Sequence, residues 1–516
     1  MDTTATTTTT THRGDKPHGD TPVAIHEEDL KVSIKSLELL EEPDPEIDGR
    51  IRHKFDRHIL PWLFAIWLFS FLDRSSIGNA NIAGISQDLK LVGTQYNLAL
   101  MLFYIPYILV DIPSNWIVKY CRAGFYLPAL ITGWGLVCTF TGFTKSLGGL
   151  IAGRLLLGFF EGGLVPGILI YLAMFYRRSE MAYRIGLFYC AAPLSSAFGG
   201  LLASGLAKIE VGSYQKWPWI FFVEGSATVL VGITAAMFLP DSITHAKFLT
   251  PEERVVAHRR VYGDARAANG MATVEQEKFS WHWVRIALFC PLPWLTSVAY
   301  MMIIVPLYAY ALFLPTIVHS LGYTSTIAQL LTAPPNVLGF FSVLLVTRLS
   351  DKAGMRAPFM VAGGILVATG YSMLLGSDLP GVKYGATFVI AIGLYPASPL
   401  CLAWLSNNAA PHYVRATSSG LQLGVGNCAA FIATYSYLAK DADPKADNVT
   451  KKSPEYTMGH SINIGAAILF CIMTTSTMLY CRWENRQREQ GARDWRLTQQ
   501  DPTRLGHLHP DFRYTL

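Results

Sequence analysis

Apolar stretches of about 20 residues recur along almost the whole chain, and this feature limits the fold more than any other. A helix of about 20 residues spans the hydrocarbon core of a bilayer. Only 15% of the 516 residues are charged, whereas about a quarter are charged in an average soluble domain. The pattern predicts an all-α, polytopic membrane protein and excludes an ordinary soluble enzyme.

The apolar stretches predict twelve transmembrane helices, six on each side of a charged segment. The expected ranges are 59–79, 95–118, 125–143, 149–175, 184–207 and 218–239, then 287–315, 326–347, 358–376, 384–405, 416–438 and 460–481. Five regions follow from them: a disordered cytosolic tail over 1–58, a six-helix bundle over 59–240, a cytosolic linker over 241–285, a second six-helix bundle over 286–482, and a cytosolic tail over 483–516.

The basic residues predict which loops face the cytosol. They gather in alternate loops and in the linker, for example Lys119, Arg122, Arg177, Arg178, Arg348, Lys352 and Arg356. By the positive-inside rule both termini are then cytosolic. The last outer loop, 439–459, contains Asn448-Val449-Thr450, so Asn448 is a candidate glycosylation site on the outer face.

An acid and a base, Asp73 and Arg74, stand together at the end of the first apolar run. A charge at mid-membrane depth costs roughly 2.5–3.5 kcal/mol on insertion scales, so it seldom lies there without a partner or a function. One alternative is a helix that ends at Leu72 and leaves both side chains among the lipid headgroups. The other is a pair of buried, functional charges.

A second pair of charges, Arg154 and Glu161, lies in the fourth apolar stretch. The two residues are seven positions apart, which places them on one helix face about 10 Å from each other. Arg154 is either a static packing partner or part of a site. Glu161 has no obvious partner in its own helix. Because apolar surroundings disfavour the charged form of a carboxyl, Glu161 suits a group that binds and releases a proton.

The remaining reactive side chains give no sign of a metal or catalytic site. Eight cysteines are scattered through the chain without metal-like spacing, and most stand in apolar runs, as small packing residues do. No zinc-binding His pair and no nucleophile elbow is present in the sequence. We therefore expect neither an enzyme nor a metal or cofactor; the proton gradient is the expected energy source, and nucleic acid is not an expected partner.

Several ordered motifs resemble a known family. They include Leu72–Ala80 (LDRSSIGNA), Gly153–Gly163 (GRLLLGFFEGG), Trp219–Gly225 (WIFFVEG) and Trp404–Asn408 (WLSNN). With the six-plus-six arrangement, they resemble the anion:cation symporters of the major facilitator superfamily, and within these the branch of fungal allantoate, nicotinate and vitamin-type permeases. The resemblance implies proton-coupled symport of a small organic anion, a carboxylate or a close relative, by alternating access.

The resemblance also implies roles for four charged residues. Asp73 and Glu161 match the protonation sites, and Arg154 matches the partner of Asp73. Arg74 matches the residue that binds the anionic group of the substrate. Arg74 suits that role on physical grounds too, because a guanidinium holds a carboxylate by two parallel hydrogen bonds and keeps its proton.

The same resemblance implies further candidate residues for substrate contact and gating. Tyr107 and Asn427 match substrate-contact positions. Tyr107 is somewhat more typical of a space-filling aromatic ring, whereas Asn427 suits a substrate contact and an amide that bridges two helices equally well. We expect Glu224 to be interfacial or structural, because it stands toward a helix end. The loop Ser350–Arg356 (SDKAGMR) is similar to the cytosolic loop motif of the superfamily, which assigns Asp351 and Arg356 to gating.

Other functions stay open beside the symporter. An exporter of an organic-acid metabolite would use the same chemistry in the opposite direction. Lys119 weakly favours a transport-inactive nutrient sensor, because it stands where the cytosolic loop motif of the superfamily has an acidic residue in the first half. The short C-terminal tail disfavours a sensor. The expected protein is a functional monomer in the plasma membrane, with a small organic anion, a proton and the lipid bilayer as its partners.

Overall fold

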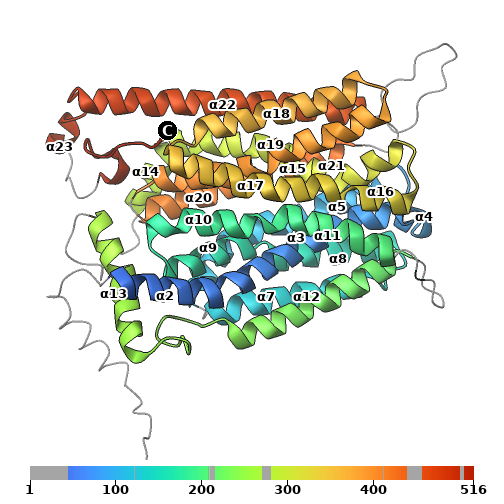
Figure 1. The fold of residues 1–516 in the computed structure, drawn as a ribbon, viewed down its shortest axis with the longest axis horizontal. Helices are drawn as coiled ribbons and strands as arrows, with labels where there is room; N and C mark the ends of the chain where they lie inside the picture. Colours follow the sequence, from blue (N-terminus) through green and yellow to red (C-terminus); the bar gives the residue numbers. More distant parts are fainter. Residues whose placement is uncertain are drawn as a thin grey trace, which may run out of the picture. The chain divides into compact units, whose positions relative to one another are not determined.

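The computed structural model describes residues 45–120, 123–206, 209, 216–269, 281–410, 412–437, 456–499 and 505–516. These residues belong to one compact unit, Pro45–Leu516, whose regular elements are helices (Figure 1). Residues 1–44 of the predicted tail and the sequon at Asn448 lie outside the described residues. So does the side chain of Lys119.

Helices of the first half follow one another closely. They are α3 (Leu60–Ile82), α4 (Ile85–Asp88), α5 (Gln95–Leu102), α6 (Tyr104–Tyr120), α7 (Ala123–Thr141), α8 (Leu147–Glu161), α9 (Leu164–Phe175), α10 (Arg178–Tyr189), α11 (Ala191–Leu206) and α12 (Pro218–Phe238). Ahead of them stands α2 (Pro45–His58), and after them come α13 (Pro251–Asn269) and α14 (Trp281–Phe289).

The second half is also a succession of helices. Its helices are α15 (Pro291–Ser320), α16 (Ser325–Leu331), α17 (Ala333–Ala353), α18 (Ala357–Gly376), α19 (Pro380–Asn408), α20 (His412–Asn427), α21 (Ala429–Ser436) and α22 (Thr457–Glu489). The short helix α23 (Trp495–Gln499) and the 3₁₀ turn η5 (Gly506–Leu508) follow. Against α3 pack α11 and α12 of its own half and α15 of the second half, so α3 lies between the two halves.

Each of the twelve predicted ranges is helical, and six of them are interrupted. The range 149–175, for example, divides into α8 and α9 at Gly162-Gly163. A Cβ added at Gly162 would come within 2.5 Å of the carbonyl oxygen of Tyr107, so glycine lets α6 approach this break. Within the described ranges, nine helical segments are long and apolar enough to cross a membrane. The full number of crossings stays a prediction.

Helix α3 does not end at Leu72, as the alternative with Asp73 and Arg74 among the lipid headgroups requires. Helix α3 continues past Leu72 to Ile82, and Asp73 and Arg74 are only 6% and 7% exposed. Neighbouring helices of both halves cover them. The headgroup alternative is therefore wrong, and both charges belong to the interior of the bundle.

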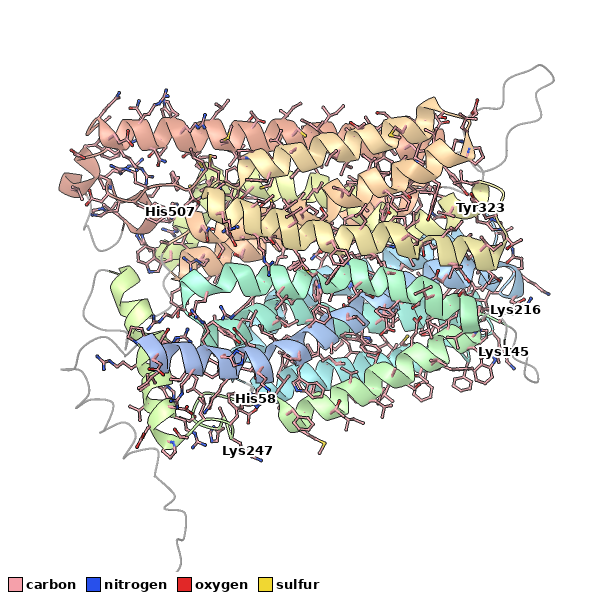
Figure 2. The ribbon with its side chains drawn as sticks, viewed as in Figure 1. His58, Lys145, Lys216, Lys247, Tyr323 and His507 are labelled. Carbon is pink, nitrogen blue, oxygen red and sulfur yellow. The ribbon has the colours of Figure 1, made fainter. Side chains whose placement is uncertain are left out.

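Residues from loops predicted to share a side lie at the same end of the bundle. Lys145, Lys216 and Tyr323, all from predicted outer loops, lie at one end in Figure 2, and His507, from the predicted cytosolic tail, lies at the other. This alternation agrees with the order of the predicted helices. Which end faces the cytosol stays a prediction.

Part of the predicted disordered tail is helical. Helix α2 buries Ile51 and Phe55 and forms ion pairs with the first half and with α13. Lys54 Nζ lies 2.6 Å from Glu253, Asp48 lies 2.7 Å from the fully buried Arg260, and Asp56 lies 2.8 Å from Arg184. The prediction of a disordered segment is thus wrong over Pro45–His58, because the amphipathic sequence there has apolar and charged partners. We call α2 and α13, with these ion pairs, the ionic clamp.

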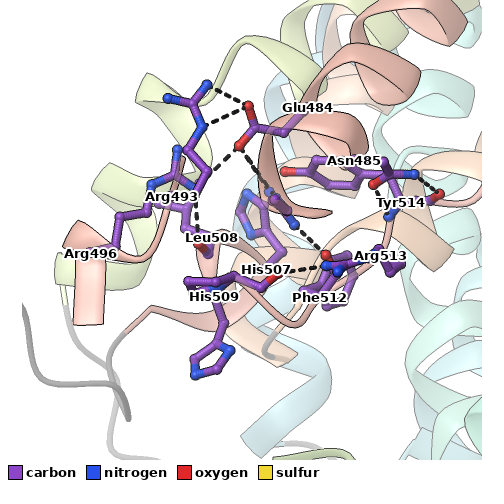
Figure 3. A network of polar contacts seen from close by, with 12 residues as sticks. Glu484, Asn485, Arg493, Arg496, His507, Leu508, His509, Phe512, Arg513 and Tyr514 are labelled. Atoms are coloured by element: carbon purple, nitrogen blue, oxygen red, sulfur yellow. Dashed lines mark hydrogen bonds and ion pairs between the residues drawn. The ribbon is translucent and has the colours of Figure 1, made fainter. Parts of the chain in front are cut away.

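The end of the chain returns to the second half. Residues 505–516, the C-terminal strap, lie against the ends of α19 and α22. Figure 3 shows the contact between Tyr514 of the strap and Asn485 of α22. Trp404 Nε1 and Asn408 Nδ2 donate to the carbonyl of Thr515 at 2.9 and 3.0 Å. Arg488 Nη1 donates to the carbonyl of Phe512 at 2.6 Å. The Trp404–Asn408 motif therefore holds the strap in place.

Candidate functional site

The central feature of the site is a buried ion pair between α3 and α8. Arg74 Nη2 donates to Glu161 Oε1, and Ser70 Oγ donates to the same oxygen at 2.6 Å. The two charged side chains are 6% and 7% exposed. Glu161 thus has a partner that its own helix did not reveal, because Arg74 reaches it from another helix.

Aromatic rings surround the guanidinium of Arg74. Its Cζ atom lies 5.1 Å from the ring centre of Phe71, 5.7 Å from that of Phe103, and 5.5 Å from those of Tyr107 and Tyr308. Such contacts stabilise a cation by about 0.5–2 kcal/mol each. Tyr107, a predicted substrate contact, therefore lies beside Arg74, and its contact with a substrate stays a prediction.

Asn427 reaches the same site from the second half. Tyr308 Oη on α15 donates to Asn427 Oδ1 on α20 at 3.0 Å, and the same hydroxyl lies 3.5 Å from Arg74 Nη1. A polar chain consequently runs from Glu161 in the first half through Arg74 and Tyr308 to Asn427. Helix α15 has several buried tyrosines, and only the helix packing singles out Tyr308.

A small cavity lies beside this ion pair. Its walls are Arg74, Ile77, Leu100, Phe103, Tyr104, Arg154 and Leu312. Arg154 is 4% exposed, and its Nε and Nη2 groups have no hydrogen-bond partner among the described residues. The buried hydroxyl of Tyr104 also lacks one within that part of the chain. Two guanidinium groups and unused donors around one cavity are suited to an anion.

Asp73 does not form the predicted pair with Arg154. Its carboxylate instead accepts hydrogen bonds from Trp134 Nε1, from Thr228 Oγ1 at 3.1 Å and from Cys138 Sγ at 3.6 Å. Consecutive residues point about 100° apart on a helix, so Asp73 faces α7 and α12 while Arg74 faces α8. The predicted pairing is corrected accordingly.

Glu224 on α12 is buried more deeply than the sequence predicted. It is 0% exposed, and its Oε2 is in hydrogen-bond contact with Ser76 Oγ. An interfacial position is therefore wrong. The apolar residues on both sides of Glu224 in Trp219–Gly225 were the available signal, because a charge inside such a run lies in the interior of the bundle.

The predicted gating residues meet in the loop between α17 and α18. Arg356 Nη2 lies 3.2 Å from Asp351 Oδ1, and Gly354 between them takes the left-handed conformation at φ +63°. The backbone N–H of Arg356 donates to the carbonyl of Leu516 at 2.6 Å. The loop is thereby joined to the C-terminal strap, and its role in gating stays a prediction.

A second small cavity lies between the two halves. Its polar wall residues are uncharged and come from α3, α11, α15, α17 and α19; they are Ser75, Asn79, Ser196, Tyr310, Asn336 and Tyr395, with Thr332 before α17. Tyr395 Oη donates to Asn336 Oδ1 at 2.6 Å, and Asn79 Oδ1 lacks a partner within the described residues.

Comparisons with known proteins agree with this architecture. The family model of the major facilitator superfamily matches residues 63–434. An uncharacterised transporter of Schizosaccharomyces pombe is 36% identical over 474 residues, which cover 92% of this chain and 91% of that protein. The high-affinity nicotinic acid transporter of Saccharomyces cerevisiae is 31% identical over 476 residues, covering 92% and 86% of the two chains.

A solved structure has the same fold. It is a bacterial homologue of the human lysosomal transporter Spinster in an inward-facing, unoccupied conformation. The TM-score is 0.61 at 15% sequence identity, and the match covers 82% of this chain and 96% of the other. At that identity the likeness concerns the fold alone.

Proposed function

Because the chain belongs to the major facilitator superfamily, we propose that this integral, multi-pass transporter couples proton entry to the uptake of a small organic anion. The family and the relatives above are transporters and not enzymes. The observation that carries the proposal is the buried Arg74–Glu161 ion pair beside the unpaired groups of Arg154. That one relative is named for nicotinic acid, a small carboxylic acid, supports the substrate class and the anion:cation symporter branch.

Charge balance in the buried pair supplies the coupling. Arg74 and Glu161 together are neutral, and both are almost fully covered. A carboxylate substrate that binds Arg74 displaces Glu161 and leaves its negative charge without a partner. An unpaired buried charge costs several kcal/mol, whereas a proton on Glu161 removes that charge. The anion and the proton therefore bind together far more favourably than the anion alone.

Arg154 strengthens the preference for an anion. Its unpaired Nε and Nη2 groups and the Tyr104 hydroxyl line the cavity next to Arg74. Hydrogen bonds between ionised groups are about twice as strong as neutral ones. A carboxylate in the cavity would accept from both arginines, so we assign Arg154 to substrate binding in place of its predicted role as the partner of Asp73.

The second half offers neutral groups to the substrate. Tyr308 and Asn427 extend the site across the boundary between the halves, and the second cavity adds uncharged donors and acceptors. Hydrogen bonds also join the halves near the predicted outer loops: Asn97 Nδ2 donates to the carbonyl of Thr434 at 2.5 Å, and Ser325 Oγ to that of Ile82 at 3.0 Å. In alternating access these contacts would open to admit substrate from outside.

The proposal is tested by uptake into proteoliposomes. Radiolabelled nicotinate and a panel of small monocarboxylates are supplied with and without an inward proton gradient. We expect at least one carboxylate to accumulate only with the gradient. Arg74→Ala should lower uptake about 30-fold or more, because a lost charged hydrogen-bonded contact costs about 2 kcal/mol or more.

Arg74→Lys is the matched variant, since it keeps the positive charge but not the planar fork of donors. We expect an intermediate rate for it. Full uptake by Arg74→Ala would remove Arg74 from the binding site. Accumulation of every accepted anion at equal rates with and without the gradient would exclude proton coupling.

A further inference from the structure

A second group of buried carboxyls lies on a different face of α3 from the Arg74–Glu161 pair. Asp73 on α3 is 6% exposed and Glu224 on α12 is 0% exposed. Glu224 Oε2 contacts Ser76 Oγ, whereas its buried Oε1 has no hydrogen-bond partner among the described residues. A fully buried carboxylate with an unsatisfied oxygen is costly, so the protonation state of this group needs an explanation.

Two hydroxyls join the carboxyls across the contact between α3 and α12. Ser76 stands three residues after Asp73, and Thr228 stands four residues after Glu224, so each hydroxyl shares a helix face with one carboxyl. Ser76 Oγ reaches across to Glu224, and Thr228 Oγ1 reaches across to Asp73 Oδ2 at 3.1 Å. The four side chains therefore form one polar cluster.

This cluster has more acceptors than hydrogens to donate. Ser76 Oγ contacts the carbonyl of Leu72 at 2.7 Å as well as Glu224 Oε2. Thr228 Oγ1 contacts the carbonyl of Glu224 at 2.9 Å as well as Asp73 Oδ2. Each hydroxyl carries one hydrogen, which can serve only one of its two acceptors well. A proton on Glu224 Oε2 supplies a missing donor, because it bonds to Ser76 Oγ while Ser76 donates to Leu72.

The charged groups around the cluster also favour a proton on it. Helices α3, α7 and α11 pack against α12. The titratable residues are Asp73 and Arg74 on α3 and Tyr126 and Cys138 on α7, and α11 has none. Arg74 is engaged with Glu161, and within the described residues no Lys, Arg or His forms an ion pair with Asp73 or Glu224. Two negative charges side by side without a cation are strongly unfavourable in a buried site.

We infer that Asp73 and Glu224 form a second proton-binding site, in which Glu224 is a neutral carboxylic acid that donates through Oε2 to Ser76. Asp73 keeps its donors from Trp134 and Thr228 and is the member of the pair that can be ionised. The site binds a proton without contact to Arg74 and therefore without competition from the substrate anion. That it serves coupling rests on the proposed function, but its protonation does not.

Infrared spectroscopy of the purified full-length protein in lipid vesicles tests the inference. A protonated carboxyl has a carbonyl stretch that is separate from the carboxylate bands and moves on exchange into deuterated water. We expect such a band at neutral pH, its loss in Glu224→Gln, and a shift to higher frequency in Ser76→Ala, because the acceptor of the O–H group is then absent. Glu253→Gln is the control for a carboxylate that is paired with cations, since Glu253 bonds to Lys54 and Arg50, and it should leave the band unchanged.

The outcome separates the inference from the proposed function. A band that survives in Glu224→Gln with its intensity unchanged would overturn the inference, whatever the protein transports. Should Glu224→Gln fold poorly, Ser76→Ala decides instead, and an unshifted band in that variant overturns it. The expected band in a protein whose uptake ignores the proton gradient would contradict the proposed coupling and leave the assignment of Glu224 standing.

Discussion

Helices α3, α8 and α12 of the first half bury five charged side chains, whereas the central helices of the second half bury neutral polar ones. The five are Asp73, Arg74, Arg154, Glu161 and Glu224. We consider the residues of α15, α17, α19 and α20 whose burial the structure describes. The buried polar ones include Asn336, Gln422 and Asn427, and none of the buried ones is charged. Both halves are built of helices, yet they differ in the chemistry of their interiors.

The difference separates two tasks. A proton changes the charge of a carboxyl and so acts on the first half, where carboxyls are buried beside arginines. Neutral amides and hydroxyls in the second half keep their hydrogen bonding across the physiological pH range, so they suit the uncharged part of a substrate. Variants of the carboxyls in the first half should therefore change coupling, and variants of the neutral groups in the second half should change affinity.

The largest effect is expected from Glu161→Gln. The amide cannot take up or release a proton, and it no longer balances the charge of Arg74. Accumulation driven by a proton gradient should be lost, while exchange of labelled for unlabelled anion across the membrane should persist. Both are measured in the same proteoliposomes, and gradient-driven accumulation at the wild-type level would take Glu161 out of the coupling site.

A smaller effect is expected from Asn427→Ala in the second half. This change removes the acceptor of Tyr308 Oη, a hydrogen bond at 3.0 Å. Loss of one hydrogen bond costs about 1 kcal/mol, so the KM for the anion should rise about fivefold with the pH dependence unchanged. Tyr308→Phe is the matched variant. A shifted pH profile in either one would contradict the division between the halves.

The ionic clamp gives a test by pH. Burial alone would raise the pKa of Glu253, but hydrogen bonds from Lys54, from the Thr250 N–H and from Arg50 lower it overall. A carboxyl with a lowered pKa stabilises the fold above its unfolded pKa, and this contribution is lost as the pH falls through its folded pKa. Glu253→Gln should lower the thermal unfolding midpoint at pH 7, and the difference from wild type should shrink in acid. An equal difference at both pH values would refute this role.

The C-terminal strap should give the smallest effect. Burial lowers the pKa of His507 to about 4, although its Nδ1 contacts the carbonyl of Ala410. A histidine buried in its neutral form stabilises the fold above its usual pKa of 6.5, and this stability declines as the pH falls from 6.5 toward 4. Asn408→Ala removes hydrogen bonds to Thr515 and should loosen the strap by about 1 kcal/mol for each bond lost. Limited proteolysis of the C-terminus across that pH range measures both changes.

The sequence predicted the helices well, because each apolar run is a local signal. It also found four of the five buried charges from their apolar surroundings. It did not predict how they pair, since pairing depends on the rotation of each helix about its axis. Glu161 on α8 pairs with Arg74 on α3. Asp73, also on α3, accepts hydrogen bonds from Trp134 on α7 and Thr228 on α12.

The sequence also did not predict the contacts between distant parts of the chain. The Trp404–Asn408 motif is visible in the sequence, but its partner Thr515 is more than a hundred residues away. From the sequence alone, α2 is interpreted as part of a polar tail, because the ion-pair partners of its charges, Glu253, Arg260 and Arg184, are distant in the sequence. Long-range complementarity of this kind needs a structure.

The most direct test of the central claim is to measure proton movement and anion uptake together. Proteoliposomes enclosing a pH-sensitive dye receive an accepted carboxylate, nicotinate being the first choice, without an imposed gradient. The account predicts acidification of the interior that rises in step with uptake and is absent in Glu161→Gln. Uptake of the anion at a normal rate with no change in internal pH would contradict it.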